Sequence, residues 1–332
     1  MHSFENVYGH EIITDSLKKI LAKNTAAHAY IFDGVSGIGK SLLSEIFARG
    51  LQCEQKIKPC NECISCRATF ASNHPDIIYV KAKGASIGVD DVREQINATV
   101  HIKPYQYKYK IFIVEKADKM TAQAQNALLK TLEEPPSYAV FLLHSQSVYN
   151  FLPTIISRCV ILKLKPLALK QVRDYLKGKA YDEKESLAAA SASGGSIGKA
   201  LMLLADEGFK QERAEISAIL NILPDSNLWD ILLLAKKLEK FKDNKDSLLN
   251  FMHLWFRDAL LQKSVDGFVN EDHIMQPDLI SLTGEFGAKM SLKNLLSGIE
   301  AIINAAVHLK ANGNYLLTME VMLMKMTGVQ YK

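Results

Sequence analysis

The feature that most constrains this chain is a glycine-rich segment between an apolar strand-like run and a helical pattern. The stretch AYIFDGVSGIGKSLLSEIFARGL fits G-x-x-x-x-G-K-[ST], with the strand before the loop and the helix after it. Backbone N–H groups of such a loop surround phosphate, the lysine reaches the outer phosphates, and the serine offers a hydroxyl to magnesium. A flexible loop without a ligand is the alternative. The segment predicts a nucleotide site at Gly34, Gly37, Gly39, Lys40 and Ser41.

Apolar runs typical of strands alternate with helical patterns through the first half of the chain: AYIF, DIIYV, KIFIV, VFLLHS and CVILKL. This alternation predicts an α/β domain, a parallel sheet covered by helices on both faces. Helical patterns alone follow Pro166. We therefore expect a nucleotide-binding domain over 1–165 with a small module at 53–66, a helical lid over 166–207, and an all-helical domain over 208–332.

The composition fits a globular protein, since 48% of the residues are hydrophobic and 23% are charged. A balance of 40 basic against 36 acidic residues is too even for global charge to indicate nucleic-acid binding. The first residues show no basic start followed by an apolar core, and no apolar run approaches the roughly eighteen residues of a membrane span. We expect a cytoplasmic protein without a membrane partner.

Four of the five cysteines gather within fourteen residues, with the spacing C-x6-C-x2-C-x2-C. Four thiolates can surround one tetrahedral Zn²⁺ and leave no position open for water, which is typical of a structural site. His74 lies just outside the set as a spare ligand, and unligated thiols or a redox pair are the alternatives. The predicted zinc ligands are Cys53, Cys60, Cys63 and Cys66.

Several motifs occur together and in order: HAYIFDG before the complete loop, the four cysteines after its helix, HPDIIYV, AQNALLKTLEEPP and LPTIISRC. This set resembles the bacterial DNA polymerase III clamp-loader subunits of the AAA+ group, most closely the delta-prime type. The resemblance covers about the first 200 residues. It implies a P-loop domain, a helical lid and a C-terminal oligomerisation domain, the collar. It also implies a subunit of a DNA polymerase holoenzyme, a nucleotidyltransferase complex that loads a sliding clamp onto primer-template DNA.

The same resemblance implies a role in trans for Arg158. The Ser-Arg-Cys motif of the family matches residues 157–159, and its arginine reaches the γ-phosphate bound by the adjacent subunit. The expected neighbours are the gamma/tau and delta subunits. The alternative is a surface arginine that follows a strand.

Departures from the family pattern indicate weak hydrolysis by this chain itself. Strands of the ATP-hydrolysing relatives end in Asp-Glu, whereas this strand ends in Glu115 and Lys116. Glu115 can still contact Mg²⁺, but an ammonium has no lone pair with which to accept a proton from water. Residues 144–146 read HSQ at the sensor position, with Ser145 beside the nucleotide, and Gly198 stands where many relatives have an arginine. We expect ATP or ADP with Mg²⁺ to bind with little or no turnover.

Two other classes of function stay open. One is an active gamma/tau-type ATPase, which Lys116 and Gly198 oppose. The other is a stand-alone zinc-containing nucleic-acid-binding protein, which would leave the Ser-Arg-Cys motif without a purpose. The stretch HIKPYQYKYKIF alternates lysine and tyrosine as DNA-binding surfaces do, but its place before the acid-bearing strand favours an exposed loop.

Overall fold

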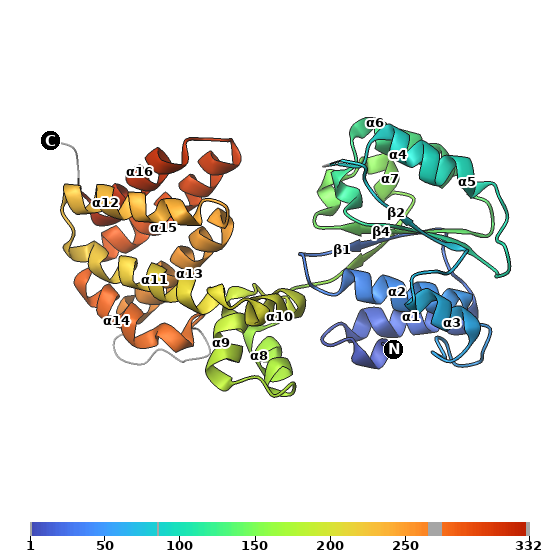
Figure 1. Cartoon of the computed structure of the whole chain (residues 1–332), viewed down its shortest axis with the longest axis horizontal. Helices are drawn as coiled ribbons and strands as arrows, with labels where there is room; N and C mark the ends of the chain where they lie inside the picture. Colours follow the sequence, from blue (N-terminus) through green and yellow to red (C-terminus); the bar gives the residue numbers. More distant parts are fainter. Residues whose placement is uncertain (1, 85, 265–273, 330–332) are drawn as a thin grey trace. The chain divides into compact units, whose positions relative to one another are not determined.

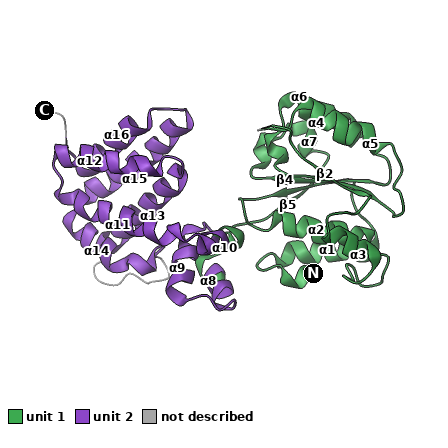
Figure 2. Ribbon diagram, viewed as in Figure 1, with its two compact units in different colours: residues 1–171, 195–199 green, residues 172–194, 200–332 purple. Residues whose placement is uncertain are grey.

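The computed structural model describes residues 2–84, 86–264 and 274–329. The chain divides into two compact units, which Figure 2 distinguishes by colour. Unit 1 comprises residues 1–171 and 195–199, and unit 2 comprises residues 172–194 and 200–332. The division of the helical part into lid and collar at residue 207 stays a prediction, and residues 265–273 and 330–332 of the predicted collar lie outside the described residues.

A five-stranded parallel sheet in the order β2-β3-β4-β1-β5 forms the centre of unit 1. Strands β1, β3 and β4 are buried along their whole length, which explains why they read as continuous apolar runs. Figure 1 shows helices on both faces of the sheet, so the predicted α/β architecture is confirmed. The strands are β1 Ala29–Asp33, β2 Ile77–Val80, β3 Lys110–Val114, β4 Ala139–Ser145 and β5 Val160–Lys163.

Successive residues of each strand face opposite sides of the sheet, so that Phe32 packs with the α1–α2 face and Ile31 with the α4–α6 face. The helices of the first face are α1 Glu11–Lys23, α2 Lys40–Gln52 and α3 Ile64–Phe70. The second face has α4 Val89–Val92, α5 Ala98–Val100, α6 Ala122–Glu133 and α7 Pro153–Ile156. Short turns of helix are η1 Phe4–Asn6, η2 Arg93–Asn97, η3 Ala117–Lys119 and η4 Val148–Asn150.

The described residues of unit 2 are mainly helical, and those from 216 onward form an apolar core of their own. Phe286 packs edge-on against Trp255 and Phe256, with ring centroids 5.9 and 5.1 Å away. The helices after residue 168 are α8 Leu169–Lys177, α9 Glu183–Ala192, α10 Ile197–Ala205, α11 Gly208–Ile222, α12 Leu228–Leu238, α13 Lys245–Ser264, α14 Ile280–Lys289, α15 Leu292–Lys310 and α16 Tyr315–Thr327, with short turns η5 Leu223–Asp225, η6 Glu239–Phe241 and η8 Pro277–Leu279.

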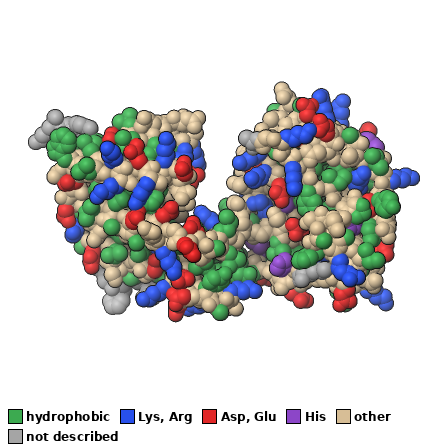
Figure 3. Space-filling view, viewed as in Figure 1, with side chains coloured by type: hydrophobic (Ala, Val, Ile, Leu, Met, Phe, Trp, Pro, Cys, Tyr) green, Lys and Arg blue, Asp and Glu red, His purple; other side chains and the backbone are tan. Residues whose placement is uncertain are grey.

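The surface agrees with the even charge balance of the sequence. Figure 3 shows basic and acidic side chains interspersed on the visible face of both units. Among the residues that the structure describes, no helix is both long enough and apolar enough to span a bilayer.

Candidate functional site

The glycine-rich loop joins the carboxyl end of β1 to the first residue of α2. Gly37 and Gly39 have backbone φ values of +74° and +108°, which residues other than glycine rarely adopt. Helix α2 begins directly after Gly39, so its first backbone N–H groups are available to an anion. The sequence therefore has glycine at the positions where the turn requires it.

The loop borders a pocket of about 260 Å³ at the carboxyl edge of the sheet, where parallel α/β folds bind ligands. Six of the predicted nucleotide-site residues line it: Gly37, Gly39, Lys40, Ser41, Glu115 and Ser145. Gly34 and Arg158 are not among the residues lining this pocket. The remaining lining residues are Ser36, Leu42, Lys116, Asp118, His144 and Gln146.

Lys40 lies against the backbone of its own loop. Its ammonium group donates hydrogen bonds to the carbonyl oxygens of Gly34 and Val35, at 2.5 and 2.8 Å. Burial lowers the pKa of Lys40, whereas the charges of Asp118 and then Asp33 raise it. The lysine that would meet the outer phosphates thus has two acidic neighbours, neither of which the sequence had singled out.

His144, at the predicted sensor position, is a neutral group at pH 7. Burial lowers its pKa to about 4, and the charge of Lys40 acts in the same direction. Its Nε2 lies 2.7 Å from the hydroxyl oxygen of Ser44 on α2. His144 therefore positions the helix that carries the loop but brings no positive charge to a phosphate.

Residues 195–199 lie on the loop and hold its middle in place. The Gly198 N–H donates to the Gly37 carbonyl at 3.0 Å, and the Ser196 hydroxyl donates to the Ser36 carbonyl at 2.9 Å. A Cβ atom built on Gly198 would lie 2.6 Å from the Gly37 oxygen. An arginine at this position would therefore require the loop to move.

We expect Gly198→Ala to destabilise the chain by about 1–3 kcal/mol, because the added methyl group overpacks a contact between two backbones. Thermal and denaturant unfolding measure the change. Gly84→Ala is the matched control, since nothing lies within 4 Å of a Cβ built there. Equal stability of the two variants would show that the loop yields to the methyl group at no cost.

Arg158 follows α7 and is held at the surface of unit 1. Its guanidinium forms an ion pair with Glu133 at 2.9 Å and donates to the Thr154 carbonyl at 2.9 Å. The side chain is 35% exposed. These contacts orient the guanidinium group while leaving part of it accessible.

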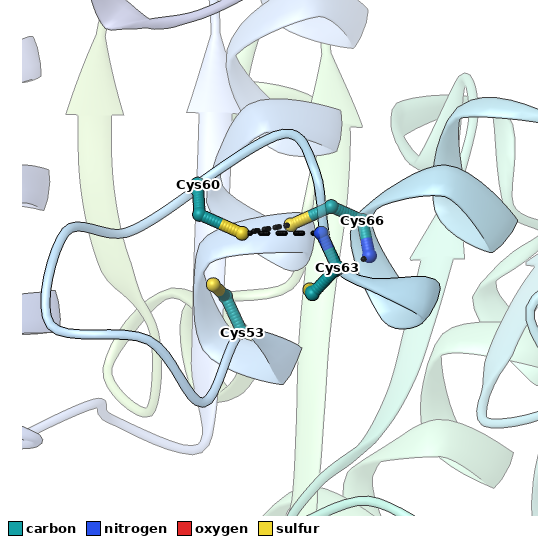
Figure 4. Close-up of side chains that lie close together, drawn as sticks. All are labelled: Cys53, Cys60, Cys63 and Cys66. Carbon is teal, nitrogen blue, oxygen red and sulfur yellow. Dashed lines mark hydrogen bonds between the residues drawn. The ribbon is translucent and has the colours of Figure 1, made fainter.

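Figure 4 shows the four clustered cysteines close together; they come from the C-terminal end of α2, the following segment and the first turn of α3. Their sulfur atoms all lie within 4.8 Å of one another, and Cys60 and Cys66 are 3.9 Å apart. A tetrahedral ion with Zn–S bonds of about 2.3 Å requires sulfur–sulfur distances of about 3.8 Å. The N–H groups of Cys63 and Cys66 donate to the sulfur atoms of Cys60 and Cys63, both at 3.4 Å. The cluster can therefore bind one metal ion.

His74 is not needed as a ligand. Its Nδ1 accepts the backbone N–H of Asp76 at 3.1 Å, so Nε2 carries the proton and donates to Ser65 at 3.2 Å. The ring also packs on Tyr107, with centroids 4.7 Å apart. Both nitrogen atoms thus have structural partners, and the metal cluster among the described residues consists of the cysteines alone.

The lysine- and tyrosine-rich stretch forms a loop whose backbone is tied to the protein. The Asp76 carboxylate accepts the N–H groups of Tyr105, Gln106 and Tyr107 at 2.5–3.2 Å. Lys110 is buried and donates to backbone carbonyls. The side chains therefore do not share one exposed face, which favours the interpretation as a connecting loop.

Asp33 and Asp118 are the site residues that sequence reasoning missed. Both are buried at the carboxyl edge of the sheet, with exposures of 6% and 9%. Asp33 directly precedes the glycine loop, and Asp118 follows Glu115 by three residues. Their positions in the sequence could have identified them as site residues, since ligands of parallel α/β folds bind at the carboxyl ends of the strands.

Residues 9–168 match the protein family described as "DNA polymerase III, delta subunit". The chain is 32% identical to DNA polymerase III subunit tau of Bacillus subtilis, over 80% of this chain and 51% of that protein. It is 27% identical to the delta-prime subunit of the same organism, over 89% of both.

The tau/gamma subunit of Haemophilus influenzae is 32% identical over 69% of this chain and 35% of that protein. The chain thus spans about half or less of the length of these tau relatives. Among solved structures, a DNA polymerase III gamma subunit-related protein of Thermotoga maritima is 21% identical, with a TM-score of 0.46 over 95% of this chain and 98% of that one.

Proposed function

We propose that this chain is a delta-prime-type subunit of a DNA polymerase III clamp loader. The proposal is supported by the match of residues 9–168 to the family described as "DNA polymerase III, delta subunit" and by the similarity to a delta-prime subunit over 89% of both chains. In this proposal the chain binds ATP or ADP, hydrolyses it slowly or not at all, and supplies Arg158 to the site of a neighbouring ATPase subunit. It acts in the cytoplasm with gamma/tau and delta subunits, a sliding clamp and primer-template DNA.

The observation that carries this proposal is a complete phosphate loop beside a lysine at the position of the catalytic acid. Lys40 and Ser41 line the pocket, which supports binding of a nucleotide with Mg²⁺. Lys116 lines it too, and its ammonium cannot accept a proton from the attacking water. The neutral His144 and the side-chain-free Gly198 provide no extra positive charge for a transition state, which supports weak turnover.

We also assign one structural Zn²⁺ to the cysteine cluster. The sulfur positions fit four thiolate ligands of a single tetrahedral ion, and two backbone N–H groups support them. Such an ion would fix the segment between α2 and α3 without an open position for chemistry. The proposed ligands are Cys53, Cys60, Cys63 and Cys66.

Unit 2 offers apolar surface for neighbouring subunits. Trp229 and Leu233 lie one turn apart on α12 and are 77% and 61% exposed. Ile303 and Val307 repeat this spacing on α15, with exposures of 51% and 61%. Exposed apolar side chains at helical spacing are typical of interfaces, which supports the predicted role of the collar in oligomerisation.

An active gamma/tau-type ATPase is the second candidate. It is favoured by the higher identity to tau of Bacillus subtilis, 32% against 27% for the delta-prime subunit. The two candidates differ in one measurable property, the rate at which the chain itself turns over ATP.

We expect the purified chain to bind nucleotide and to hydrolyse ATP near background. Lys40→Ala should weaken binding at least tenfold, since a hydrogen bond to a charged group contributes about 1.5–3 kcal/mol. Equilibrium titration and a steady-state ATPase assay measure the two quantities, and Lys116→Glu tests whether an acid restores turnover. Brisk hydrolysis that is lost in Lys40→Ala would instead identify a motor subunit. Nucleotide affinity that is equal in Lys40→Ala and the unmodified chain would contradict the assignment of the loop.

A further inference from the structure

Three buried oxygen atoms near the glycine-rich loop have no hydrogen-bond partner within the described part of the chain; two of them belong to residues that line the nucleotide pocket, Asp118 and Ser145. The three atoms are Oδ1 of Asp33, Oδ1 of Asp118 and Oγ of Ser145. The side chains are only 6%, 9% and 1% exposed. Leaving one buried acceptor unsatisfied costs roughly 1–3 kcal/mol and more for a charged group, so three together indicate a ligand or ordered water.

The fold brings these atoms to one face of the sheet. Asp33 and Ser145 are direct partners in the β1–β4 register, so their side chains point to the same side. Two residues earlier in each strand, Ile31 and Leu143 pack in the core of the α4–α6 face. Asp33 and Ser145 therefore extend that face to the edge where ligands bind.

Asp118 joins them because the chain turns sharply after β3. Lys116 adopts a left-handed conformation, φ +51°, and the η3 turn follows. Oδ2 of Asp118 accepts the backbone N–H of Gln146 at 3.2 Å, next to Ser145. One carboxylate oxygen is thus anchored to the end of β4, and the other is buried without a hydrogen-bond partner in a residue that lines the pocket together with Lys40 and Ser41.

Glu115, the acid that the family pattern selects, is placed differently. It is exposed, and it continues the alternation of β3 on the side of Ile113, which belongs to the α1–α2 face. The carboxylates whose charges act on Lys40 are those of Asp118 first and Asp33 second. The acid electrostatically linked to the phosphate-binding lysine is therefore buried and fixed, whereas Glu115 is exposed.

We propose that Asp118, supported by Asp33 and Ser145, is the carboxylate that holds the divalent cation of a bound nucleotide. This inference rests on the proposed function, since the cation arrives with the nucleotide. Magnesium prefers oxygen ligands and is bound by one or two carboxylates together with phosphates and water. The buried oxygen set offers that chemistry, either directly or through an ordered water molecule.

The test is the Mn²⁺ affinity of the full chain in the presence of ADP, with free and bound Mn²⁺ distinguished by electron paramagnetic resonance. Asp118→Asn keeps an oxygen acceptor for the Gln146 N–H but loses the charge, and Glu115→Gln is its matched control. We expect Asp118→Asn to weaken Mn²⁺ binding by about 10–100-fold, as loss of a residue that supports a metal does, and Glu115→Gln by less than about threefold. ADP affinity measured in EDTA should not fall in Asp118→Asn, because loss of an acidic neighbour does not weaken the attraction of Lys40 for phosphate.

Three results would overturn the inference. A large loss in Glu115→Gln with none in Asp118→Asn would return the role to Glu115. Unchanged Mn²⁺ binding in both variants would mean that the buried oxygens are satisfied by water alone. Failure of the unmodified chain to bind ADP with or without metal would remove the proposed function itself, a result distinct from the other two. If Asp118→Asn does not fold, Asp33→Asn and Ser145→Ala provide the same comparison with Glu115→Gln.

Discussion

Replacing Arg158 by alanine is expected to lower ATP hydrolysis by the assembled clamp loader about 10³-fold or more at the site that this arginine serves. The chain itself should fold and bind nucleotide as before. Arg158 does not line the pocket of its own loop, and its contacts with Glu133 and Thr154 are at the surface. An arginine held by such contacts and still partly exposed is suited to reach a phosphate on another subunit, where it would stabilise transition-state charge.

The measurement is the ATPase rate of the complex reconstituted with the cognate gamma/tau and delta subunits. Arg158→Lys should rescue little, because an ammonium cannot reproduce the forked geometry of a guanidinium on phosphate. Arg173→Ala is the control, since Arg173 is similarly exposed and pairs with the neighbouring Asp174. A rate for Arg158→Ala equal to that of the control would remove the role in trans. Glu133→Gln separates the orientation of Arg158 from its charge. This variant removes the ion pair that orients the guanidinium group but leaves the positive charge of Arg158 in place.

The sheet and the cysteine cluster were predictable because their signals are local. Strands buried on both faces must be apolar throughout, as β1 and β4 are, and such runs are visible in a window of a few residues. The spacing of the cysteines likewise limits them to one small module. These features depend on residues close in the sequence.

The part of the site that escaped prediction depends on distant contacts. Ser196 bonds to Ser36 across 160 residues, and nothing in either segment alone indicates that the two meet. Asp118 enters the pocket only because Lys116 adopts a left-handed conformation, which is uncommon for a residue other than glycine. His74 looked like a ligand from its position in the sequence, but the N–H of Asp76 occupies its Nδ1.

Loss of a metal ion from the cysteine cluster is expected to lower the melting temperature by roughly 6–12 °C. This range assumes that about 3 kcal/mol of folding free energy is lost and that each kcal/mol lowers the melting temperature by about 2–4 °C. The binding free energy of a structural zinc ion is larger, about 10–16 kcal/mol in isolated zinc fingers, because there the metal supplies most of the fold. Here α2 packs on the sheet and α3 packs on α2, so a bound metal would stabilise mainly the segment between the two helices. The loss should therefore be partial and local.

Cys60→Ser in the full chain provides the test, since it removes one thiolate from the less buried side of the cluster. Metal analysis should find about one zinc ion per chain before the change and markedly less after it, because an alcohol oxygen is a poor replacement for a thiolate ligand. Cys159→Ser is the matched control, because Cys159 is a half-buried cysteine outside the cluster. If the unmodified chain contains no metal and both variants melt at the same temperature, the cluster is a set of free thiols. The fixed distance between α2 and α3 would then depend on packing alone.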